Sequence, residues 1–386
     1  MNNKCYYKLL VVGNAYDNHI VRYVENLRKV NDKCIIDIIT KKMGDSICQS
    51  LFESVNNIFE FSSKKVGFLR HIKNIVGFRR FVEQKLVGKK YDVVVIQYVF
   101  GDYLFILPIL RKCARILISC PWGSDILRTG AIEHFAQHII FKNSDFIVCG
   151  DTRFGKYVQS RYAIPKNKIC KYGLAGSAFV DLLLEKNNKI SSLDAKTFMG
   201  ISANSYVITC AYNSSPAQNH SIILKSLGKI EDLLPQNLVL LFPFTYGGGD
   251  EDYKQTIKTL ASSLNFHSIF IESYLSEEDL FYLRKCSDMF IHIQNTDANN
   301  ASLKEYLYCG VKVINGSWLE YDDLTCYEPL PYWEVTSFDD LPNTILQAYN
   351  DKPKNLPQEW CDNFRSFGAH YRANKLNEFY SECVEK

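Results

Sequence analysis

Residues 7–39 read YKLLVVGNAYDNHIVRYVENLRKVNDKCIIDII, and the order of elements in this stretch points to the architecture of the whole chain. An apolar run over residues 7–12 stops at Gly13, and apolar side chains then recur at helical spacing between residues 16 and 29. A second apolar run covers residues 34–39. This order predicts a strand, a crossover helix and a second strand parallel to the first.

The same alternation of apolar runs and helical periodicity continues through the chain. Further strands are predicted over residues 93–97, 115–119, 146–149, 206–212, 238–243, 268–272, 289–293 and 312–315. Because periodic stretches separate them, each sheet should be parallel and covered by helices on both faces. The chain has 386 residues, more than the roughly 250–300 that one core supports, and the polar segment 185–196 is predicted to link two α/β domains.

Composition excludes several classes of protein. Hydrophobic residues make up 47% and charged residues 23% of the chain, which excludes a disordered or collagen-like protein. No apolar run reaches the roughly 18–20 residues that a membrane-spanning helix needs, and no signal-peptide pattern precedes Gly13, so we expect a cytoplasmic protein. The 13 cysteines include no CxxC pair, and most of them should be buried, inert thiols.

Charge divides the chain more sharply than its net value of +3 implies. Residues 1–185 hold 28 lysines and arginines against 16 acids, and residues 186–386 hold 17 against 26. The densest basic stretch, residues 62–90, interleaves apolar side chains with Lys64, Lys65, Arg79 and Arg80. A solvated helix face and docking on an anionic membrane explain this stretch equally well. Nucleic-acid binding is a weaker explanation, because no recognised motif accompanies the charge.

In open α/β sheets ligands bind beyond the carboxyl ends of the strands, so the loops there are the first candidates for chemistry. The loop over residues 211–220 is small and polar, and Asn219 suits the N-cap of a helix whose free amides attract an anion. A plain helix start explains this composition as well. The candidate phosphate-binding residues of this loop are Asn213, Ser214, Asn219 and His220.

A second candidate loop, residues 242–250, reads FPFTYGGGD. Three consecutive glycines let backbone amides approach a ligand without an intervening Cβ. The spacing matches neither a P-loop nor a GxGxxG fingerprint, and a flexible turn is the alternative. Its candidate ligand-binding residues are Thr245, Tyr246, Gly247 and Gly248.

The strongest local pattern lies in residues 295–310, NTDANNASLKEYLYCG. Glu305 falls in an apolar helical stretch, where a carboxylate is costly unless it accepts hydrogen bonds. A ribose diol supplies two suitable donors, and solvation or a structural partner is the alternative. Asp297 either faces the sugar of a nucleotide-sugar or caps the helix. The helix start completes the candidate site with Ala301, Ser302 and Leu303.

The first half offers two candidate acid–base groups. His19 follows the loop that begins with Gly13 and Asn14, and it is either a general base or hydroxyl ligand, or a packed capping residue. Asp125 ends a strand segment and is either a base that deprotonates an acceptor hydroxyl or a helix cap. No spacing typical of metal ligands stands out, so we expect no metal.

These motifs together resemble those of glycosyltransferases with the GT-B fold. Asp297 and Glu305 match the paired acids of that superfamily, and residues 279–288 resemble the helix and strand start before them. Asn213-Ser214, Asn219-His220 and residues 242–247 resemble bacterial 4-acetamido-4,6-dideoxygalactose (Fuc4NAc) transferases. Residues 121–126 (PWGSDI) and 171–173 (KYG) resemble the acceptor-domain loop and interdomain segment of polysaccharide glycosyltransferases.

The resemblance implies two Rossmann-like, doubly wound domains. The expected boundaries are 1–185 for an acceptor domain and 186–359 for a nucleotide-sugar domain, with the last helix, 360–386, packing back on the first. Two positions depart from the superfamily pattern. Asp297 stands where a glutamate is common, and Gln218, Asn219 and His220 replace the usual basic pair at the diphosphate, for which Lys225 is a candidate substitute.

We therefore expect a metal-independent glycosyltransferase without a cofactor. It would move a sugar from a nucleotide diphosphate to a polyprenyl-linked saccharide at the inner face of the cell membrane, in the synthesis of O-antigen or capsule. Two alternatives remain: a nucleotide-sugar epimerase of the same architecture, and a catalytically degenerate scaffold of a polysaccharide assembly complex.

Overall fold

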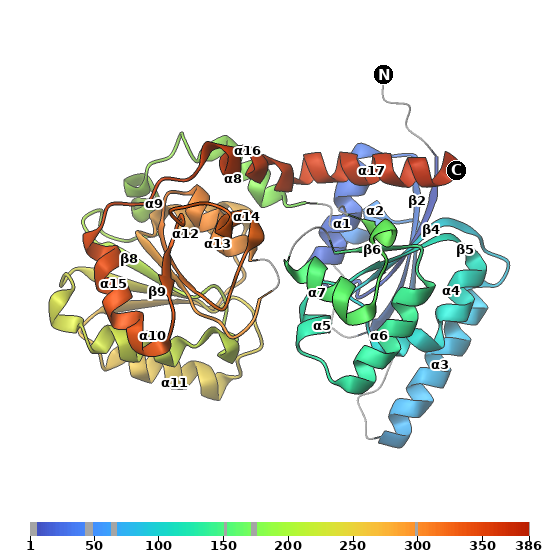
Figure 1. Ribbon diagram of the computed structural model, residues 1–386, viewed down its shortest axis with the longest axis horizontal. Coiled ribbons are helices and arrows are strands. Elements are labelled where there is room, and N and C mark those ends of the chain that lie inside the picture. Colours follow the sequence, from blue (N-terminus) through green and yellow to red (C-terminus); the bar gives the residue numbers. More distant parts are fainter. Residues whose placement is uncertain are drawn as a thin grey trace. The chain divides into compact units, whose positions relative to one another are not determined.

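The structure is a computed structural model, which describes residues 6–42, 49–62, 68–149, 153–170, 176–297 and 300–385. The chain divides into two compact units. Unit 1 comprises residues 1–178 and 366–386, and unit 2 comprises residues 179–365. Each unit is a parallel sheet flanked by helices (Figure 1), which confirms the predicted α/β class.

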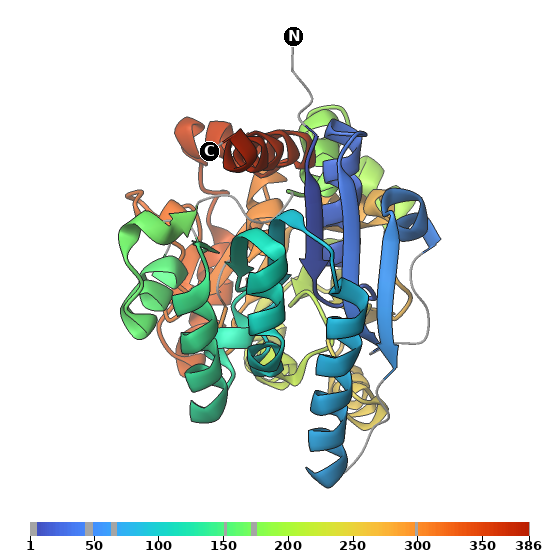
Figure 2. The same cartoon turned by 90° about the vertical axis from the view of Figure 1, so that its right-hand side faces the viewer.

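Unit 1 is built on a seven-stranded parallel sheet in the order β3-β2-β1-β4-β5-β6-β7. Its strands are β1 (Lys8–Val12), β2 (Ile35–Lys42), β3 (Asn57–Ser62), β4 (Tyr91–Gln97), β5 (Ala114–Cys120), β6 (Phe146–Val148) and β7 (Ile169–Cys170). Its helices are α1 (Asn18–Val30), α2 (Gln49–Ser54), α3 (Phe68–Leu86), α4 (Leu107–Cys113), α5 (Ser124–Leu127), α6 (Ala131–Asn143), α7 (Arg153–Tyr162) and α17 (Ala369–Glu385). The long helix α3 is the blue helix beside the sheet in Figure 2.

The central strands of unit 1 are apolar on both faces. In β1, Leu10 and Val12 pack into one core cluster and Leu9 and Val11 into the other, because successive side chains of a strand point to opposite faces. Both clusters are buried under helices, which explains the unbroken apolar runs of the sequence. Successive strands are added on one side from β1 to β3 and on the other side from β4 to β7. The winding of the sheet therefore reverses between β1 and β4, which pair in parallel register, and we call this place the reversal point.

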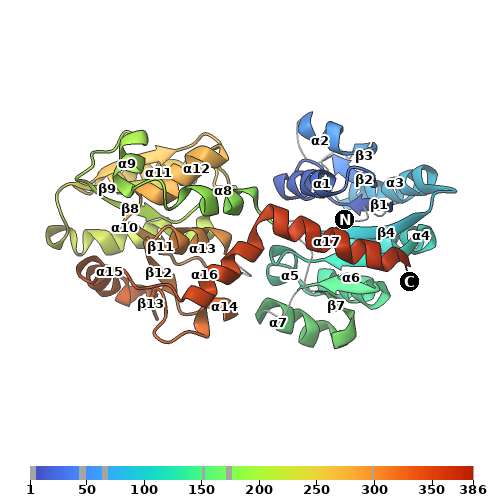
Figure 3. The same ribbon diagram turned by 90° about the horizontal axis from the view of Figure 1, so that it is seen from above.

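The C-terminal helix α17 completes the core of unit 1, as Figure 3 shows from above. Leu376 is fully buried in the cluster that contains β1, and Tyr380 exchanges a hydrogen bond with the Tyr23 hydroxyl of α1. Tyr7 donates to Asn377 at 3.1 Å. The segment that leads into α17 passes Gly176, whose φ is +71° and whose absent Cβ would lie 2.3 Å from the Gly368 oxygen.

Unit 2 is built on a six-stranded parallel sheet in the order β10-β9-β8-β11-β12-β13. Its strands are β8 (Tyr206–Cys210), β9 (Leu238–Pro243), β10 (His267–Ile271), β11 (Met289–His292), β12 (Lys312–Gly316) and β13 (Trp333–Val335). Its helices are α8 (Ala178–Lys186), α9 (Ser192–Phe198), α10 (His220–Gly228), α11 (Glu251–Ser262), α12 (Glu277–Cys286), α13 (Ala301–Tyr308), α14 (Asp322–Thr325), α15 (Leu341–Asn350) and α16 (Gln358–Phe364). The winding reverses between β8 and β11.

The structure differs from the sequence expectation at the domain junction. Residues 185–196, expected as a linker, hold the end of α8 and the start of α9. A capping box formed by Ser191 and Asp194 starts α9, and Ala195 is fully buried against the sheet of unit 2. The polar composition of this segment therefore reflects a capped surface helix, and the units divide after residue 178 and again after residue 365.

Candidate functional site

Two loops of unit 2 are joined at the carboxyl edge of its sheet. The backbone amide and the hydroxyl of Ser214, which follows β8, both donate to the Tyr246 carbonyl, which follows β9, at 2.7 and 2.8 Å. Gly247 has φ +115°, and a Cβ on it would lie 2.6 Å from Asn213 Oδ1. A Cβ on Gly249 would lie 2.2 Å from the Ser214 oxygen. The absence of a side chain at these two glycines therefore lets the two loops contact each other.

Gly248 is different from its two neighbours. Its φ is +76°, and the space where its Cβ would lie has no atom within 4 Å. Thr245 beside this turn is half-buried and Tyr246 is 54% exposed. Of the three glycines that were predicted to admit a ligand, Gly248 is therefore the one whose backbone faces open space.

The first turn of α10 lies at the reversal point between β8 and β11. Asn219 occupies the N-cap position in a left-handed conformation, with φ +62°, but its side chain does not cap the helix. Its amide nitrogen instead donates to the Ile293 carbonyl at 2.7 Å and to Asn295 Oδ1 at 2.9 Å. Asn219 therefore takes the predicted N-cap position, but its side chain ties the β8 loop to the β11 loop instead of capping the helix, and this leaves the helix end open to an anion.

His220, the first residue of α10, is fully buried. Its Nδ1 lies 2.8 Å from the Tyr253 hydroxyl, and its Nε2 has no hydrogen-bond partner. Burial lowers the pKa of His220 to about 4, against an opposing effect of the Asn213 backbone. The imidazole is therefore neutral at pH 7 and does not replace the positive charge of a basic pair. Lys225 lies in the second turn of α10 with an exposed side chain.

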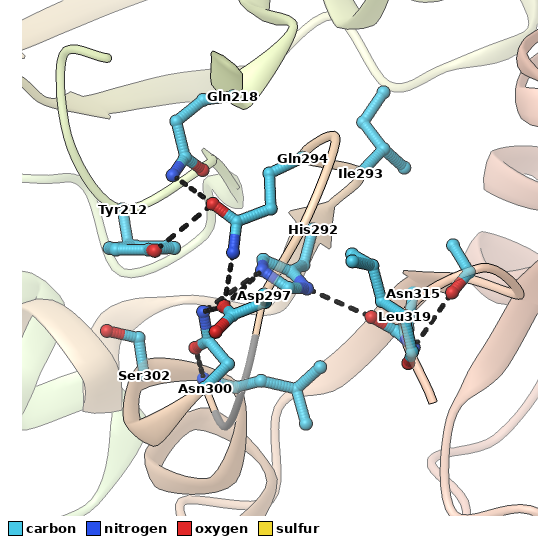
Figure 4. A network of polar contacts seen from close by, with 12 residues as sticks. Tyr212, Gln218, His292, Ile293, Gln294, Asp297, Asn300, Ser302, Asn315 and Leu319 are labelled. Atoms are coloured by element: carbon cyan, nitrogen blue, oxygen red, sulfur yellow. Dashed lines mark hydrogen bonds and ion pairs between the residues drawn. The ribbon is translucent and has the colours of Figure 1, made fainter. Parts of the chain in front are cut away.

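Asp297 belongs to a network of polar side chains between β11, α13 and β12 (Figure 4). Asn300 caps α13 by accepting from the Leu303 amide at 2.6 Å, and its own amide group donates to Asp297 Oδ2 at 2.6 Å. Gln294 also donates to the Asp297 carboxylate. Asp297 is thus held in one orientation by two side-chain amides. The helix is capped by Asn300, although capping was one of the two roles that the sequence suggested for Asp297.

The fully buried His292 contacts two side chains of this network, Asn300 and Asn315. Its Nε2 lies 3.0 Å from the Asn300 amide nitrogen and its Nδ1 lies 2.9 Å from Asn315 Oδ1. The Asn315 amide nitrogen donates to the Leu319 carbonyl, so Oδ1 must accept and His292 must carry its proton on Nδ1. Burial lowers the pKa of His292, although the nearby Asp297 opposes the shift. A neutral histidine therefore orients Asn300, and through it Asp297.

Glu305 is almost completely buried and pairs with a buried arginine that sequence reasoning missed. Arg284 on α12 donates from Nε to Glu305 Oε2 at 3.2 Å, and its other nitrogens reach the Tyr306 hydroxyl at 2.9 Å and Ser302 Oγ at 3.0 Å. The guanidinium carbon also lies 4.4 Å from the centre of the Tyr306 ring. Arg284 is the kind of structural partner that the sequence analysis gave as the alternative to ribose binding for Glu305.

The other residues of this candidate site take several roles. Ser302 accepts from Arg284, the Leu303 side chain is in the core, and Ala301 is exposed at the start of α13. Gln218 is buried and donates to Gln294 at 2.9 Å, but its own oxygen has no partner. An unsatisfied buried carbonyl beside the open end of α10 is a group that a donor on a ligand can satisfy.

In unit 1, the loops after β1, β4 and β5 meet at the corresponding reversal point. A Cβ on Gly13 would lie 2.9 Å from Ile20 Cδ1 and 3.4 Å from the Gln97 oxygen, so glycine lets α1 pack onto the ends of β1 and β4. Asn14 Oδ1 accepts from the Tyr16 amide, and Asp17 caps α1 by accepting from the His19 amide. His19 itself is exposed, with its ring 5.1 Å from that of Trp122.

Asp125 occupies a position unlike that of a solvent-facing base. It is 1% exposed, and its carboxylate accepts from the amides of Val99 (2.8 Å), Trp122 (3.0 Å) and Gly123 (2.8 Å). Burial raises the pKa of Asp125, and these backbone donors oppose the shift. The carboxylate ties the loop after β4 to the loop after β5.

Residues 68–86 of the basic stretch form α3. Arg79 and Arg80 are exposed, and Arg79 donates to the Phe105 carbonyl at 2.6 Å. Lys64 and Lys65 lie outside the described residues, as do residues 171–173. In the described part of the chain, no helix is long and apolar enough to cross a membrane, and no group of three or more His, Cys, Asp or Glu side chains is arranged to hold a metal.

Comparisons with known proteins identify the fold. No protein-family model and no curated sequence matches the chain. A glycosyltransferase from Rickettsia africae is similar with a TM-score of 0.71 at 14% identity, covering 100% of both chains. Anabaena Alr3699/HepE, solved with UDP and glucose, has a TM-score of 0.64 at 12% identity and covers 98% of this chain and 97% of its own.

A UDP-GlcNAc 2-epimerase from Methanocaldococcus jannaschii is also similar. Its TM-score is 0.58 at 15% identity, covering 97% of this chain and 99% of that one. The likeness extends over both units in each case, and at such identities it concerns the fold. The architecture of this chain is therefore that of the GT-B glycosyltransferases.

Proposed function

We propose that this chain transfers a glycosyl group from a nucleoside diphosphate sugar, bound by unit 2, to an acceptor bound by unit 1. One observation carries the proposal: a fixed, half-buried carboxylate, Asp297, and the uncapped first turn of α10 lie on either side of the reversal point of the second sheet. A sugar hydroxyl suits the first and a diphosphate suits the second.

In the described loops of unit 2, backbone amides would bind the donor, with little contribution from basic side chains. The backbone amides of His220 and Ser221, at the open end of α10, would bind the diphosphate, and Gly248 would let it approach the neighbouring turn. During transfer these amides and the helix dipole would stabilise the departing phosphate oxygen. Glu305, which is paired with Arg284, would accept hydrogen bonds from the ribose hydroxyls.

On the acceptor side, we assign the contact with the reacting hydroxyl to His19. His19 is exposed at the reversal point of the first sheet, whereas both oxygens of Asp125 are occupied by backbone amides. A neutral imidazole there can take the proton of a hydroxyl. We therefore move the expected base role from Asp125 to His19.

The finer proposal is a peripheral enzyme of bacterial surface-polysaccharide synthesis, such as one that makes O-antigen or capsule. Its acceptor would be a polyprenyl-linked saccharide at the inner membrane face, and its donor sugar would be of the Fuc4NAc kind. The sequence motifs of residues 213–220 and 242–247 support the sugar class. The exposed Arg79 and Arg80 on α3, within the stretch that contains Lys64 and Lys65, support contact with anionic lipid.

A panel of nucleotide-sugars tests the donor proposal. Thermal stabilisation of the protein by one member, reduced in Asp297→Asn but retained in Asp252→Asn, would support it; Asp252 is an exposed aspartate on α11. If no member of the panel stabilises the protein, or if D252N loses as much stabilisation as D297N, this use of unit 2 is refuted.

The likeness to the archaeal epimerase keeps a second function open to test. An epimerase converts its nucleotide-sugar into an isomer without an acceptor, whereas a transferase releases a nucleoside diphosphate when an acceptor is added. Chromatography of the donor, incubated alone and with a saccharide acceptor, separates the two. A degenerate scaffold would bind the donor and change it in neither incubation.

A further inference from the structure

A group of aromatic side chains stands at the reversal point of the first sheet. Tyr98 follows β4, Trp122 follows β5 and His19 lies in the first turn of α1. The Trp122 ring lies edge-on to both neighbours, with centroids 5.6 Å from Tyr98 and 5.1 Å from His19. Tyr98 and Trp122 are half-buried and His19 is exposed, so each of these residues keeps part of its surface open to solvent. We call these three residues the aromatic platform.

The backbone of Tyr98 is strained to hold its ring in this place. Its φ is +60°, a left-handed conformation that is a true outlier for a bulky residue. Such strain persists only where the surroundings enforce it, and it concentrates at binding and catalytic sites. The Tyr98 amide donates to the Cys120 carbonyl and its own carbonyl accepts from the Phe100 amide, so both sides of the residue are fixed.

The buried carboxylate of Asp125 joins the parts of the platform. It accepts from the Val99 amide, next to Tyr98, and from the amide of Trp122. The Trp122 indole donates to Gln97 at 2.9 Å, and the Ser124 hydroxyl donates to the Tyr98 hydroxyl at 3.2 Å. The positions of the Tyr98 and Trp122 rings therefore depend on one carboxylate that has no solvent-facing task of its own.

The structure assigns to this platform the binding of a pyranose ring of the acceptor, an inference that rests on the proposed transferase function. A pyranose presents a face of C–H groups, which packs on the electron-rich face of an aromatic ring, and a rim of hydroxyls. The Tyr98 hydroxyl and the His19 ring nitrogens, which belong to the platform, and Ser124 Oγ beside it can form hydrogen bonds with such a rim. In this assignment Asp125 is a positioning residue.

The test uses the whole protein labelled with 5-fluorotryptophan. The chain has four tryptophans, and Trp122→Phe identifies the fluorine resonance of Trp122. The probes are the methyl glycosides of glucose, galactose and N-acetylglucosamine, with acyclic sorbitol as the control for a polyol without a ring. We expect a saturable shift of the Trp122 resonance with at least one glycoside and no shift with sorbitol.

Two substitutions then separate binding from folding. Tyr98→Gly removes the ring and suits the left-handed backbone, so it should keep or raise the thermal midpoint while glycoside affinity falls roughly tenfold. Tyr371→Ala, which removes an exposed tyrosine of the same unit, should leave affinity unchanged. Asp125→Asn should move the Trp122 resonance in the free protein and weaken glycoside binding, without altering stabilisation by nucleotide-sugars.

Several outcomes would overturn the assignment. These are an unmoved Trp122 resonance with every glycoside, an equal shift with sorbitol, an unchanged affinity in Y98G, or a shift produced by uridine and adenosine in place of glycosides. The result is independent of the donor experiment, because the donor experiment measures nucleotide-sugar binding by unit 2. A glycoside bound at Trp122 without any nucleotide-sugar stabilisation would refute the transferase function and leave a carbohydrate-binding site.

Discussion

The buried His220 should make the stability of unit 2 depend on pH in a way that a single substitution removes. Its pKa is lowered by burial from 6.5 to about 4 in the folded chain. Between these values the unfolded chain binds more protons at this residue than the folded chain does, so stability falls as the pH falls from 6.5 towards 4. The full difference corresponds to about 3 kcal/mol.

Urea denaturation measures this contribution. The tryptophans of unit 2, Trp318, Trp333 and Trp360, report its unfolding by fluorescence at a series of pH values between 4 and 7. We expect the wild-type free energy of unfolding to fall by about 3 kcal/mol more than that of His220→Gln across this range. His267→Gln, which replaces an exposed histidine of the same unit, should leave the wild-type profile unchanged.

The same argument concerns donor binding. A histidine that is neutral at pH 7 contributes no charge to the diphosphate, so the affinity for a nucleotide-sugar should not rise as the pH falls from 8 to 6. Calorimetric titration checks this at the two pH values. Parallel unfolding profiles for the wild type and H220Q would refute the reasoning, and so would an affinity that increases with protonation of an imidazole that H220Q removes.

The remaining predictions concern both units. Glu305→Gln should weaken donor binding by about 1.5–3 kcal/mol in calorimetry, with Glu334→Gln as the exposed control, and an unchanged dissociation constant would exclude the ribose contact. Arg284→Met should lower the free energy of unfolding by about 3–5 kcal/mol, because Glu305 is left buried without its partner; the double variant R284M/E305L should recover most of the loss in urea denaturation. If the double variant is no more stable than R284M, the ion pair does not explain the loss. Charge reversal of Lys64, Lys65, Arg79 and Arg80 should release the protein from anionic liposomes in co-sedimentation at low salt, and pelleting that neither salt nor reversal changes would argue against membrane docking.

The sequence predicted the fold well because the informative strands are buried on both faces. Continuous apolar runs such as those of β1 and β4 are typical of strands buried under helices on both faces, and together with the alternating helical periodicity they indicated the parallel α/β class. Three of the four edge strands, β3, β7 and β13, were missed, whereas the fourth, β10, was predicted. In β3 every residue is half-buried or exposed, and β7 and β13 have two and three residues, so none of them produces a long apolar run.

The sequence predicted which loops follow the carboxyl ends of the strands better than it predicted the contacts within them. These loops lie where the winding of each sheet reverses. The contacts depend on partners far apart in the sequence. Arg284 lies 21 residues before Glu305, and Asp125 binds an amide 26 residues away, so no local pattern reveals either pairing. A histidine in an otherwise apolar strand, His292, was the one local signal of the buried network.

The return of α17 to unit 1 has a consequence for the order in which the molecule is made. Unit 2 is one continuous segment, whereas unit 1 needs residues from both sides of it. Leu376, Tyr380 and Cys383 belong to a core whose other buried members are synthesised first. During synthesis, unit 2 is therefore complete and able to fold while unit 1 still lacks its last helix. Unit 1 is thus begun first and completed last. Until α17 packs onto it, the apolar surface that this helix covers stays exposed, and chaperones bind such surfaces.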